Sequence, residues 1–161
     1  MTVKNAEFED MNQAGRIMAR SFRASFGDFV SKQTMDACAQ EDSCIALLEG
    51  IFLEGKVHFL LGESSGLLAW QQTEDGAEII ALHTLPESHG TGLGRELLTT
   101  ALTQIGSRPV FLWAFAENTR ARRFYEKNGF HWDGSTRVSE FDGAIEVRYT
   151  NKYASSERNI P

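Results

Sequence analysis

One short loop of this chain has the residue types and spacing that bind phosphate. It reads His89-Gly90-Thr91-Gly92-Leu93-Gly94, and an apolar run over residues 79–85, ended by Pro86, comes before it. A helix is predicted after it, because apolar residues recur there at helical spacing: Leu93, Leu97, Leu98, Ala101, Leu102 and Ile105. A strand, a glycine-rich turn and a helix in this order direct free backbone N–H groups and the positive end of the helix dipole at one spot, which suits a phosphate. The glycines allow phosphate oxygens to approach the backbone closely.

Two familiar phosphate-binding loops do not fit this pattern. A Walker loop has Lys-Ser/Thr after its last glycine, whereas Gly94 is followed by Arg95 and Glu96. A dinucleotide fingerprint has the spacing G-x-G-x-x-G in an early strand–helix–strand unit, whereas this loop has G-x-G-x-G past the middle of the chain. Taken alone, the glycines are as compatible with a plain tight turn as with a phosphate site.

A second pair of polar residues follows one helix and one strand later. Asn118 and Tyr125 are in a stretch, 118–128, that has helical spacing and Gly129 at its end. Their separation corresponds to about 700° of helix rotation, roughly 20° short of two turns. Both side chains therefore share one face of the predicted helix.

The remaining elements are predicted from apolar periodicity and turn residues. Strands are expected over 2–5, 56–62, 67–72, 77–85 and 109–115, with a terminal hairpin of 131–140 and 144–149. Further helices are expected over 9–26, with Asp10 or Asn12 as N-cap, and over 31–38 and 42–53. Short connections predict an antiparallel meander over 56–85, and the crossover helix predicts that 109–115 runs parallel to 78–85. Because 109–115 lacks polar alternation, we expect it to be buried on both faces.

Composition and charge limit the class of protein. The chain has 161 residues, 42% of them apolar, which predicts a single globular domain over 1–161 with a frayed tail at 154–161. A net charge of −6 argues against nucleic acid or an anionic membrane as partner and is compatible with a cationic substrate such as an amine. No signal-peptide segment and no apolar run of about 18 residues is found, so we expect a cytoplasmic location.

The two cysteines, Cys38 and Cys44, stand in a region with helical character. On one helix their side chains would point about 120° apart, so we expect free thiols rather than a disulfide. Companion residues for a metal site are missing from the pattern, and no metal is expected.

The two polar patterns together resemble the signature motifs of the GNAT N-acetyltransferase superfamily. The first is Pro86-x-x-His89-Gly-Thr-Gly-Leu-Gly94-Arg95, and the second is Asn118-x-x-Ala121-x-x-Phe124-Tyr125-x-x-x-Gly129-Phe130. The resemblance covers essentially the whole order of elements. It implies an α/β (α+β) fold with a mixed central sheet of roughly seven strands, flanked by helices, in which the fourth and fifth strands splay apart around a cofactor.

The resemblance also implies acetyl-CoA as the acyl donor and assigns roles to residues. The backbone of the fourth strand would pair edge-on with the pantetheine, the glycine loop would hold the pyrophosphate, and Asn118 would contact the pantetheine arm. The implied cofactor-binding residues are Leu82, His83, Thr84, His89, Gly90, Thr91, Gly92, Leu93, Gly94, Arg95, Asn118 and Tyr125. The family usually has Gln or Arg at the loop position occupied here by His89, which would make binding weaker or pH-dependent.

Acetyl transfer to an amine requires three groups, and the resemblance proposes candidates for each. Tyr125 would protonate the departing thiolate, and a backbone N–H on the fourth strand, that of Thr84, would stabilise the oxyanion. Glu78 would be the general base, because its position resembles that of the glutamate used by the histone acetyltransferase branch. The other interpretation of Glu78 is a surface carboxylate at the start of the strand, and the chain would then use no such base. Glu117 acting through water, or His83, is the alternative, and Trp113 occupies the position of the base used in the ribosomal-protein branch.

We therefore interpret the chain as an acetyl-CoA-dependent N-acetyltransferase that modifies a primary amine of a small molecule or a peptide N-terminus. A longer acyl group or a hydroxyl acceptor would change the substrates but not the class. A catalytically weakened CoA-binding sensor or scaffold is the alternative from another class, and a nucleotide-binding regulatory module is a third. The acceptor would lie against the front helices and the final hairpin, with Phe29, Trp132, Arg148 and Tyr149 in reach, and a homodimer is compatible with the pattern.

Overall fold

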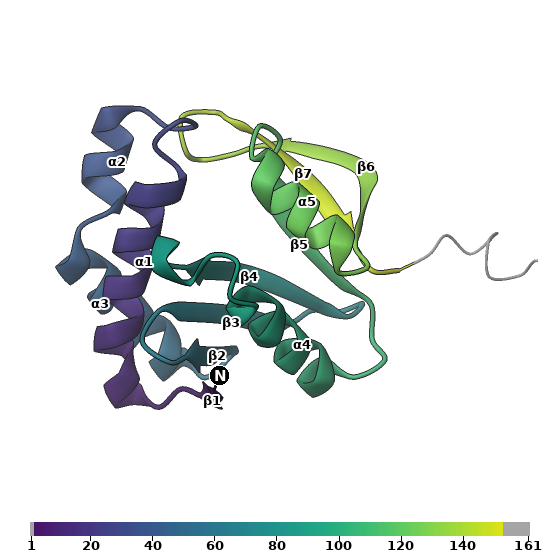
Figure 1. Ribbon diagram of the computed structural model, residues 1–161, viewed down its shortest axis with the longest axis horizontal. Helices are drawn as coiled ribbons and strands as arrows, with labels where there is room; N and C mark the ends of the chain where they lie inside the picture. The colour runs from purple at the N-terminus through teal and green to yellow at the C-terminus, as the bar shows by residue number, and fades with distance from the viewer. Residues whose placement is uncertain (1, 153–161) are drawn as a thin grey trace, which may run out of the picture.

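The strands and helices follow the predicted order in the computed structural model, which describes residues 2–152 (Figure 1). The tail predicted to be frayed, 154–161, lies outside the described residues. The strands are β1 (Val3–Asn5), β2 (Val57–Gly62), β3 (Gly66–Gln72), β4 (Ala77–Thr84), β5 (Val110–Phe115), β6 (His131–Val138) and β7 (Ile145–Thr150). The helices are α1 (Met11–Ser25), α2 (Lys32–Cys38), α3 (Glu41–Glu54), α4 (Leu93–Ile105) and α5 (Thr119–Lys127), with 3-10 turns at Phe8–Asp10 and Pro86–Ser88.

The seven strands form one mixed sheet in the order β1-β2-β3-β4-β5-β7-β6. β1 to β4 pair antiparallel, which confirms the predicted meander, and β4 pairs parallel with β5, which confirms the crossover. The parallel pairing ends at Ile79 opposite Leu112. Beyond that point the two strands diverge toward α1, as Figure 1 shows, so the predicted splay is present.

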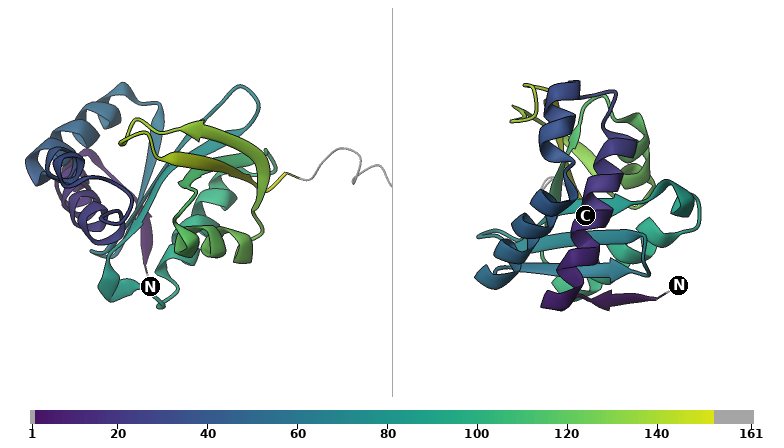
Figure 2. Two further views of the ribbon diagram at one scale, coloured as in Figure 1. Left: turned by 90° about the horizontal axis from the view of Figure 1, so that it is seen from above. Right: turned by 90° about the vertical axis from the view of Figure 1, so that its left-hand side faces the viewer.

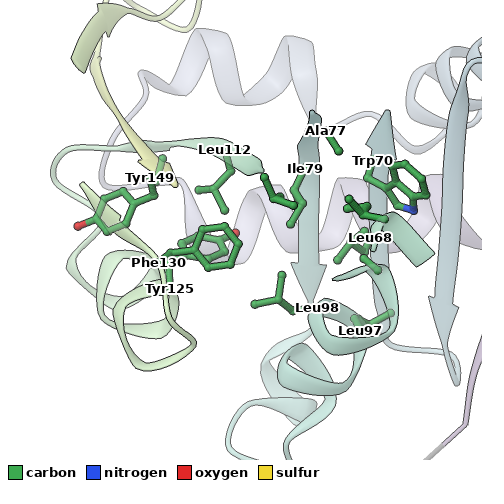
Figure 3. Close-up of a cluster of buried hydrophobic side chains, with 14 of the residues drawn as sticks. Leu68, Trp70, Ala77, Ile79, Leu97, Leu98, Leu112, Tyr125, Phe130 and Tyr149 are labelled. Carbon is green, nitrogen blue, oxygen red and sulfur yellow. The ribbon is translucent and has the colours of Figure 1, made fainter. Parts of the chain in front are cut away.

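Helices cover both faces of the sheet, with α1 and α3 on one side and α4 and α5 on the other (Figure 2). The larger core cluster lies under α4 and α5 and contains Leu68, Ile79, Leu97, Leu98 and Tyr125, among others (Figure 3). A Cβ on Gly62 or Gly66 in the β2–β3 hairpin would come within 3 Å of Leu93, so these glycines allow α4 to pack close to the sheet. That packing fixes where α4 begins, and hence where the glycine loop lies.

The prediction that β5 is buried on both faces is wrong for one of them. Val110, Leu112 and Ala114 are buried under α4 and α5, but Phe111 and Trp113 on the other face are half-buried. Helices α1 and α3 pack against β2 to β4, and the β5 rings are covered instead by arginines. Arg137 Cζ lies 4.3 Å from the centre of the Trp113 ring, and Arg148 Cζ lies 5.8 Å from that of Phe111.

Two local predictions also need correction. Asp10 occupies the N-cap position of α1, as predicted, but its side chain makes no capping hydrogen bond to that helix: its carboxylate accepts the Glu7 N–H (2.8 Å) at a preceding 3-10 turn, and Asn12 lies inside the helix. Cys38 and Cys44 are on different helices, because the chain breaks between α2 and α3; the Cys44 thiol donates to the Cys38 carbonyl (3.3 Å), and both cysteines are free. Within residues 2–152, no helix combines the length and apolar character needed to cross a membrane.

Candidate functional site

The splay between β4 and β5 opens into a large cavity, with a volume of about 1300 Å³. Its walls come from both sides of the sheet. The loop and the starts of α4 and α5 line one half, whereas α1, the segment after it and α3 line the other. The cavity therefore passes through the sheet at the point where two strands fail to pair.

The edge of β4 presents backbone hydrogen-bonding groups to this gap. Leu85 N–H donates to Ser65 O (2.9 Å), so these residues form a hydrogen-bonded pair of the β3–β4 ladder. Hydrogen-bonded and non-hydrogen-bonded pairs alternate along antiparallel strands, and Thr84 and Leu82 are the next non-hydrogen-bonded positions. Their N–H and C=O groups therefore point away from β3 into the gap, whereas the backbone of His83 faces β3.

The glycine loop has a backbone shape that requires glycine and leaves room beside it. Gly90 and Gly92 have φ of +80° and +90°, in the left-handed region, and a Cβ on Gly90 would meet no atom within 4 Å. Thr91 Oγ1 donates to Ser88 O (2.6 Å), which fixes the turn. At the start of α4 helix geometry leaves the N–H groups of Gly94 and Arg95 without intrahelical acceptors, so they are available to a ligand.

The His89 side chain connects the glycine loop to the end of β4 through a hydrogen bond. Its Nε2–H donates to Thr84 O (3.0 Å), so the neutral ring must carry its proton on Nε2. The side chain is half-buried rather than free at the loop edge. This contact occupies one of the two carbonyls that the β4 edge presents to the gap, and it ties the start of the phosphate loop to the strand.

Tyr125 and Asn118 both line the cavity, as the shared helix face predicted. The Asn118 side chain accepts the Ala121 N–H (3.1 Å) and so caps α5. Tyr125 is 8% exposed, and burial raises the pKa of its hydroxyl, which therefore stays protonated at neutral pH. Figure 3 shows its hydroxyl oxygen pointing from α5 toward the sheet.

His83 reaches the other half of the cavity. Its Nδ1 lies 3.1 Å from Ser21 Oγ on α1, and both side chains are buried. Burial lowers the pKa of the imidazole to about 4, because the charged form would lose its hydration. The ring is therefore neutral at physiological pH, and it lies 6.2 Å from the Phe26 ring, centre to centre.

Glu78 is located where the parallel pairing of β4 with β5 is still intact, opposite Phe111. Its carboxylate accepts Gln71 Nε2–H (3.3 Å), and Gln71 lines the cavity, so the carboxylate is one side chain removed from the cavity wall. Glu117, the alternative, is exposed in the turn before α5, and Trp113 lines the cavity.

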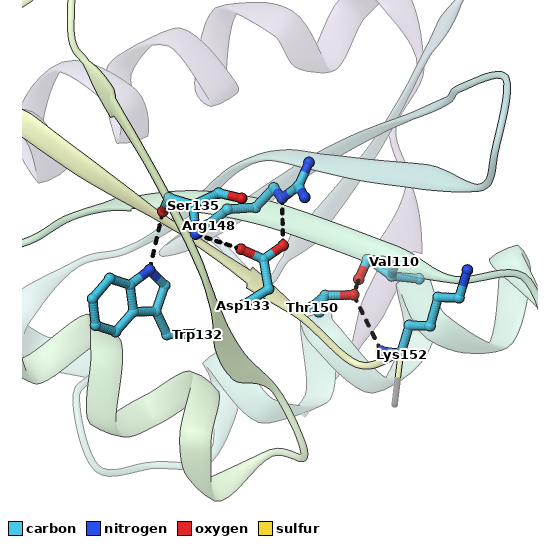
Figure 4. A network of polar contacts seen from close by, with 7 residues as sticks. All are labelled: Val110, Trp132, Asp133, Ser135, Arg148, Thr150 and Lys152. Carbon is cyan, nitrogen blue, oxygen red and sulfur yellow. Dashed lines mark hydrogen bonds and ion pairs between the residues drawn. The ribbon is translucent and has the colours of Figure 1, made fainter. Parts of the chain in front are cut away.

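Of the four residues expected near the acceptor, Phe29 lines this cavity and the other three do not. Tyr149 is fully buried under α5, where its hydroxyl donates to Glu126 Oε2 (2.7 Å). Arg148 and Trp132 line a separate cavity at the far end of β5, where Arg148 Nε donates to Asp133 Oδ2 and Trp132 Nε1 donates to Ser135 O (Figure 4). The register of β6 against β7 is irregular between Trp132 and Thr136, next to this cavity, and the strand pattern gave no sign of that irregularity.

The sequence pattern indicated Phe29 near the acceptor but not the other four aromatic rings that line the second half of the cavity. This aromatic lining comes from segments that are distant in sequence: Phe22, Phe26, Phe29, Phe115 and Phe141. Regarded singly, each has the spacing of a core residue. The tip of the final hairpin is what brings Phe141 to the others, and Asp142 beside it accepts hydrogen bonds from Ser31 N–H and Thr34 Oγ1 of the α2 N-terminus.

Comparison with known proteins places these features in a family. Residues 12–130 match the model of the Acetyltransferase (GNAT) family. A protein of Mycobacterium tuberculosis described as a probable N-acetyltransferase is 42% identical over 62 residues. That segment is 38% of this chain and 36% of the relative, so the chain spans about a third of the length of the curated relative it matches.

Solved structures with the same fold extend over nearly the whole chain. The PaiA N-acetyltransferase of Thermoplasma acidophilum in complex with coenzyme A superposes with a TM-score of 0.78 at 19% identity, covering 95% of this chain and 100% of that one. A variant of spermidine N-acetyltransferase from Vibrio cholerae superposes with a TM-score of 0.67 at 17% identity, covering 93% and 94%. At sequence identities this low, the structural similarity shows that the chain shares the fold of these proteins.

Proposed function

This chain belongs to the GNAT acetyltransferase family, and from that premise we propose that it transfers an acetyl group from acetyl-CoA directly to a primary amine of a small molecule or a peptide N-terminus. The observation that carries the proposal is the cavity through the β4–β5 splay, bounded by the glycine loop on one side and open on the other. Such a passage lets a donor and an acceptor meet from opposite faces of the sheet.

The residues of the donor half fit coenzyme A. The space beside Gly90 and the free N–H groups at the start of α4 suit a pyrophosphate, and the cavity wall there carries basic side chains from Arg95, Arg120 and Lys127. The gap-facing N–H and C=O groups of Leu82 suit the amides of a pantetheine arm lying as an extra strand, whereas His89 already occupies the Thr84 carbonyl. Acetyl-CoA supplies the acetyl group as an activated thioester.

The acceptor must arrive as a neutral amine, and this creates the need for a base. An amine with a pKa near 10.4 is neutral in about one part in 10^3.4 at pH 7, a penalty of roughly 4.6 kcal/mol. We assign the base to Glu78, acting through water beside Gln71 at the acceptor face of β4. The neutral His83 is the competing acceptor of that proton, held by Ser21.

Two further groups are needed for the transfer, one to protonate the departing sulfur and one to donate a hydrogen bond to the carbonyl oxygen. One N–C bond forms and one C–S bond breaks, so the amine nitrogen loses a proton and the sulfur gains one. The buried, protonated Tyr125 hydroxyl is the donor assigned to the sulfur, and the gap-facing N–H of Thr84 is the donor assigned to the carbonyl oxygen.

The test measures release of free CoA thiol from acetyl-CoA in the presence of small amines and a short peptide, with the product mass checked. We expect turnover with at least one amine, and a loss of about 10²-fold in kcat for Glu78→Gln. A similar loss in Glu117→Gln with Glu78→Gln unchanged would move the base to Glu117. CoA binding without turnover of any amine would overturn the enzyme proposal and favour the sensor or scaffold alternative.

A further inference from the structure

The acceptor half of the cavity is built from aromatic rings that contact one another. Adjacent rings lie 4.8 to 6.4 Å apart, centre to centre, across the five phenylalanines Phe22, Phe26, Phe29, Phe115 and Phe141. Phe26 also makes an edge-on contact with His83, next to the β4 edge that faces the donor. The rings therefore form a continuous apolar wall that runs from the predicted reaction centre outward.

This wall is part of a core cluster that is open along one edge, because Phe22 and Phe115 are buried whereas the other three rings are partly exposed. Phe26 and Phe29 are half-buried, and Phe141 is 36% exposed at the tip of the final hairpin. Two further large apolar side chains lining the same cavity are exposed, Leu47 on α3 (51%) and Ile80 on β4 (46%). Exposed apolar residues gathered around one cavity are the usual sign of an apolar ligand.

The charges around the acceptor half do not suit a polycation. Among the described residues that line the cavity, the carboxylates are Glu54 and Glu146, and Glu146 is paired with Arg137 Nε (2.9 Å). That leaves the exposed Glu54, at the end of α3, for the several ammonium groups of a polyamine. Ammonium groups that leave water without a partner are strongly disfavoured.

The charged side chains lining the cavity also disfavour an amino acid as the acceptor. Its carboxylate would need a basic partner, but the basic residues lining the cavity are Arg95, Arg120 and Lys127, which belong to α4 and α5 on the donor side. His83, the titratable group among the aromatic rings, is neutral at physiological pH. An acceptor with one amine and no second charge meets none of these penalties.

We propose that the acceptor is a primary amine that carries one aromatic or compact apolar group and no other charge, with that group lying against the five phenylalanines. The inference rests on the proposed acetyltransferase function and adds the substrate class. The amine nitrogen would then lie near His83 and the β4 edge, where the aromatic wall meets the donor half.

The test compares kcat/KM for four acceptors that differ in charge and in their apolar group: 2-phenylethylamine, 3-methylbutylamine, spermidine and phenylalanine. We expect 2-phenylethylamine to exceed spermidine and phenylalanine by at least about tenfold, with 3-methylbutylamine between them. Spermidine or phenylalanine as the best acceptor would overturn the substrate class while leaving the acetyltransferase function intact. Failure of every amine in a protein that still binds CoA would overturn both.

Two matched pairs of variants locate the effect in the cavity. Leu47→Ser and Leu53→Ser both replace an exposed leucine of α3, but Leu47 lines the cavity and Leu53 does not. Phe141→Ser and Phe8→Ser likewise replace rings of similar exposure, inside and outside the cavity wall. We expect the KM for 2-phenylethylamine to rise about fivefold in Leu47→Ser and about tenfold in Phe141→Ser, with the KM for acetyl-CoA unchanged. An equal rise in each control would place the amine elsewhere.

Discussion

Replacing Gly90 by alanine tests two roles of this glycine separately: it allows a backbone conformation with positive φ, and it leaves space beside the loop for a phosphate. The residue has φ of +80°, which an L-residue adopts at a cost of about 1–2 kcal/mol. A Cβ there would meet no protein atom within 4 Å, so no clash adds to this cost. For a chain of 161 residues, each kcal/mol corresponds to about 2–4 °C, and we expect the midpoint of thermal unfolding to fall by roughly 2–8 °C.

The second effect is on the ligand. The open space beside Gly90 is where the pyrophosphate of CoA is proposed to lie, and the added methyl group would occupy it. We expect the Kd for CoA, measured by calorimetry, to rise at least about tenfold, which corresponds to about 1.4 kcal/mol.

Gly134→Ala is the matched control for this variant. Gly134 is in β6 at the edge of the sheet, with φ of +92° and no atom within 4 Å of an added Cβ. It should lose comparable stability and keep its CoA affinity within about twofold. If Gly90→Ala melts earlier but binds CoA as the unmodified chain does, the loop is a plain turn and the phosphate site is refuted.

Three further predictions concern the catalytic acid, the hairpin contact and helix packing. Tyr125→Phe should lower kcat by about 10²-fold in steady-state assays and leave the Kd for CoA within about twofold; equal losses in both would contradict a role as proton donor. The Thr34 hydroxyl and then the Ser31 N–H lower the pKa of Asp142. The stability that this carboxylate adds should therefore be present above the usual carboxyl range and be lost as pH falls through the lowered value. The melting temperatures of Asp142→Asn and the unmodified chain should then differ at pH 6, and the difference should shrink as pH falls through the lowered pKa of Asp142. A difference that is constant with pH would refute the contact. Gly15→Ala should destabilise by about 1–3 kcal/mol because its Cβ would lie 2.5 Å from Ile45, whereas Gly50→Ala in open space should stabilise by about 1 kcal/mol in denaturant unfolding.

Much of the fold could be predicted because local chemistry and tertiary structure agree in the middle of the chain. The apolar run before Pro86, the glycines after it and the periodic leucines of α4 each indicate one element, and the crossover rule fixes the direction of β5. The β4–β5 splay followed from the family resemblance. The register of β3 against β4 refined that expectation, because it directs the backbone of Leu82 and Thr84, but not that of His83, into the gap.

The rest depended on contacts between distant segments, which no local pattern encodes. The register of β3 against β4 shifts beside Ala69, so Ile80 is an extra residue of β4. Simple alternation along β4 therefore does not predict which side chains lie on which face of the sheet. The apolar sequence of β5 predicted burial on both faces, but Trp113 is covered by the Arg137 side chain of β6 rather than by a helix. Apart from Phe29, the aromatic acceptor wall was missed for the same reason, since its rings come from α1, the following segment, β5 and the tip of the final hairpin.

Calorimetric titration of acetyl-CoA, CoA and 3′,5′-ADP into the protein, at pH 6 and pH 8, tests the proposed donor site most directly. Because the β4 edge and Asn118 are proposed to bind the pantetheine arm, acetyl-CoA and CoA should bind with similar affinity, and 3′,5′-ADP at least about a hundredfold more weakly. Absence of acetyl-CoA binding at both pH values, or equal affinity for 3′,5′-ADP, would contradict a donor site in the splay between β4 and β5.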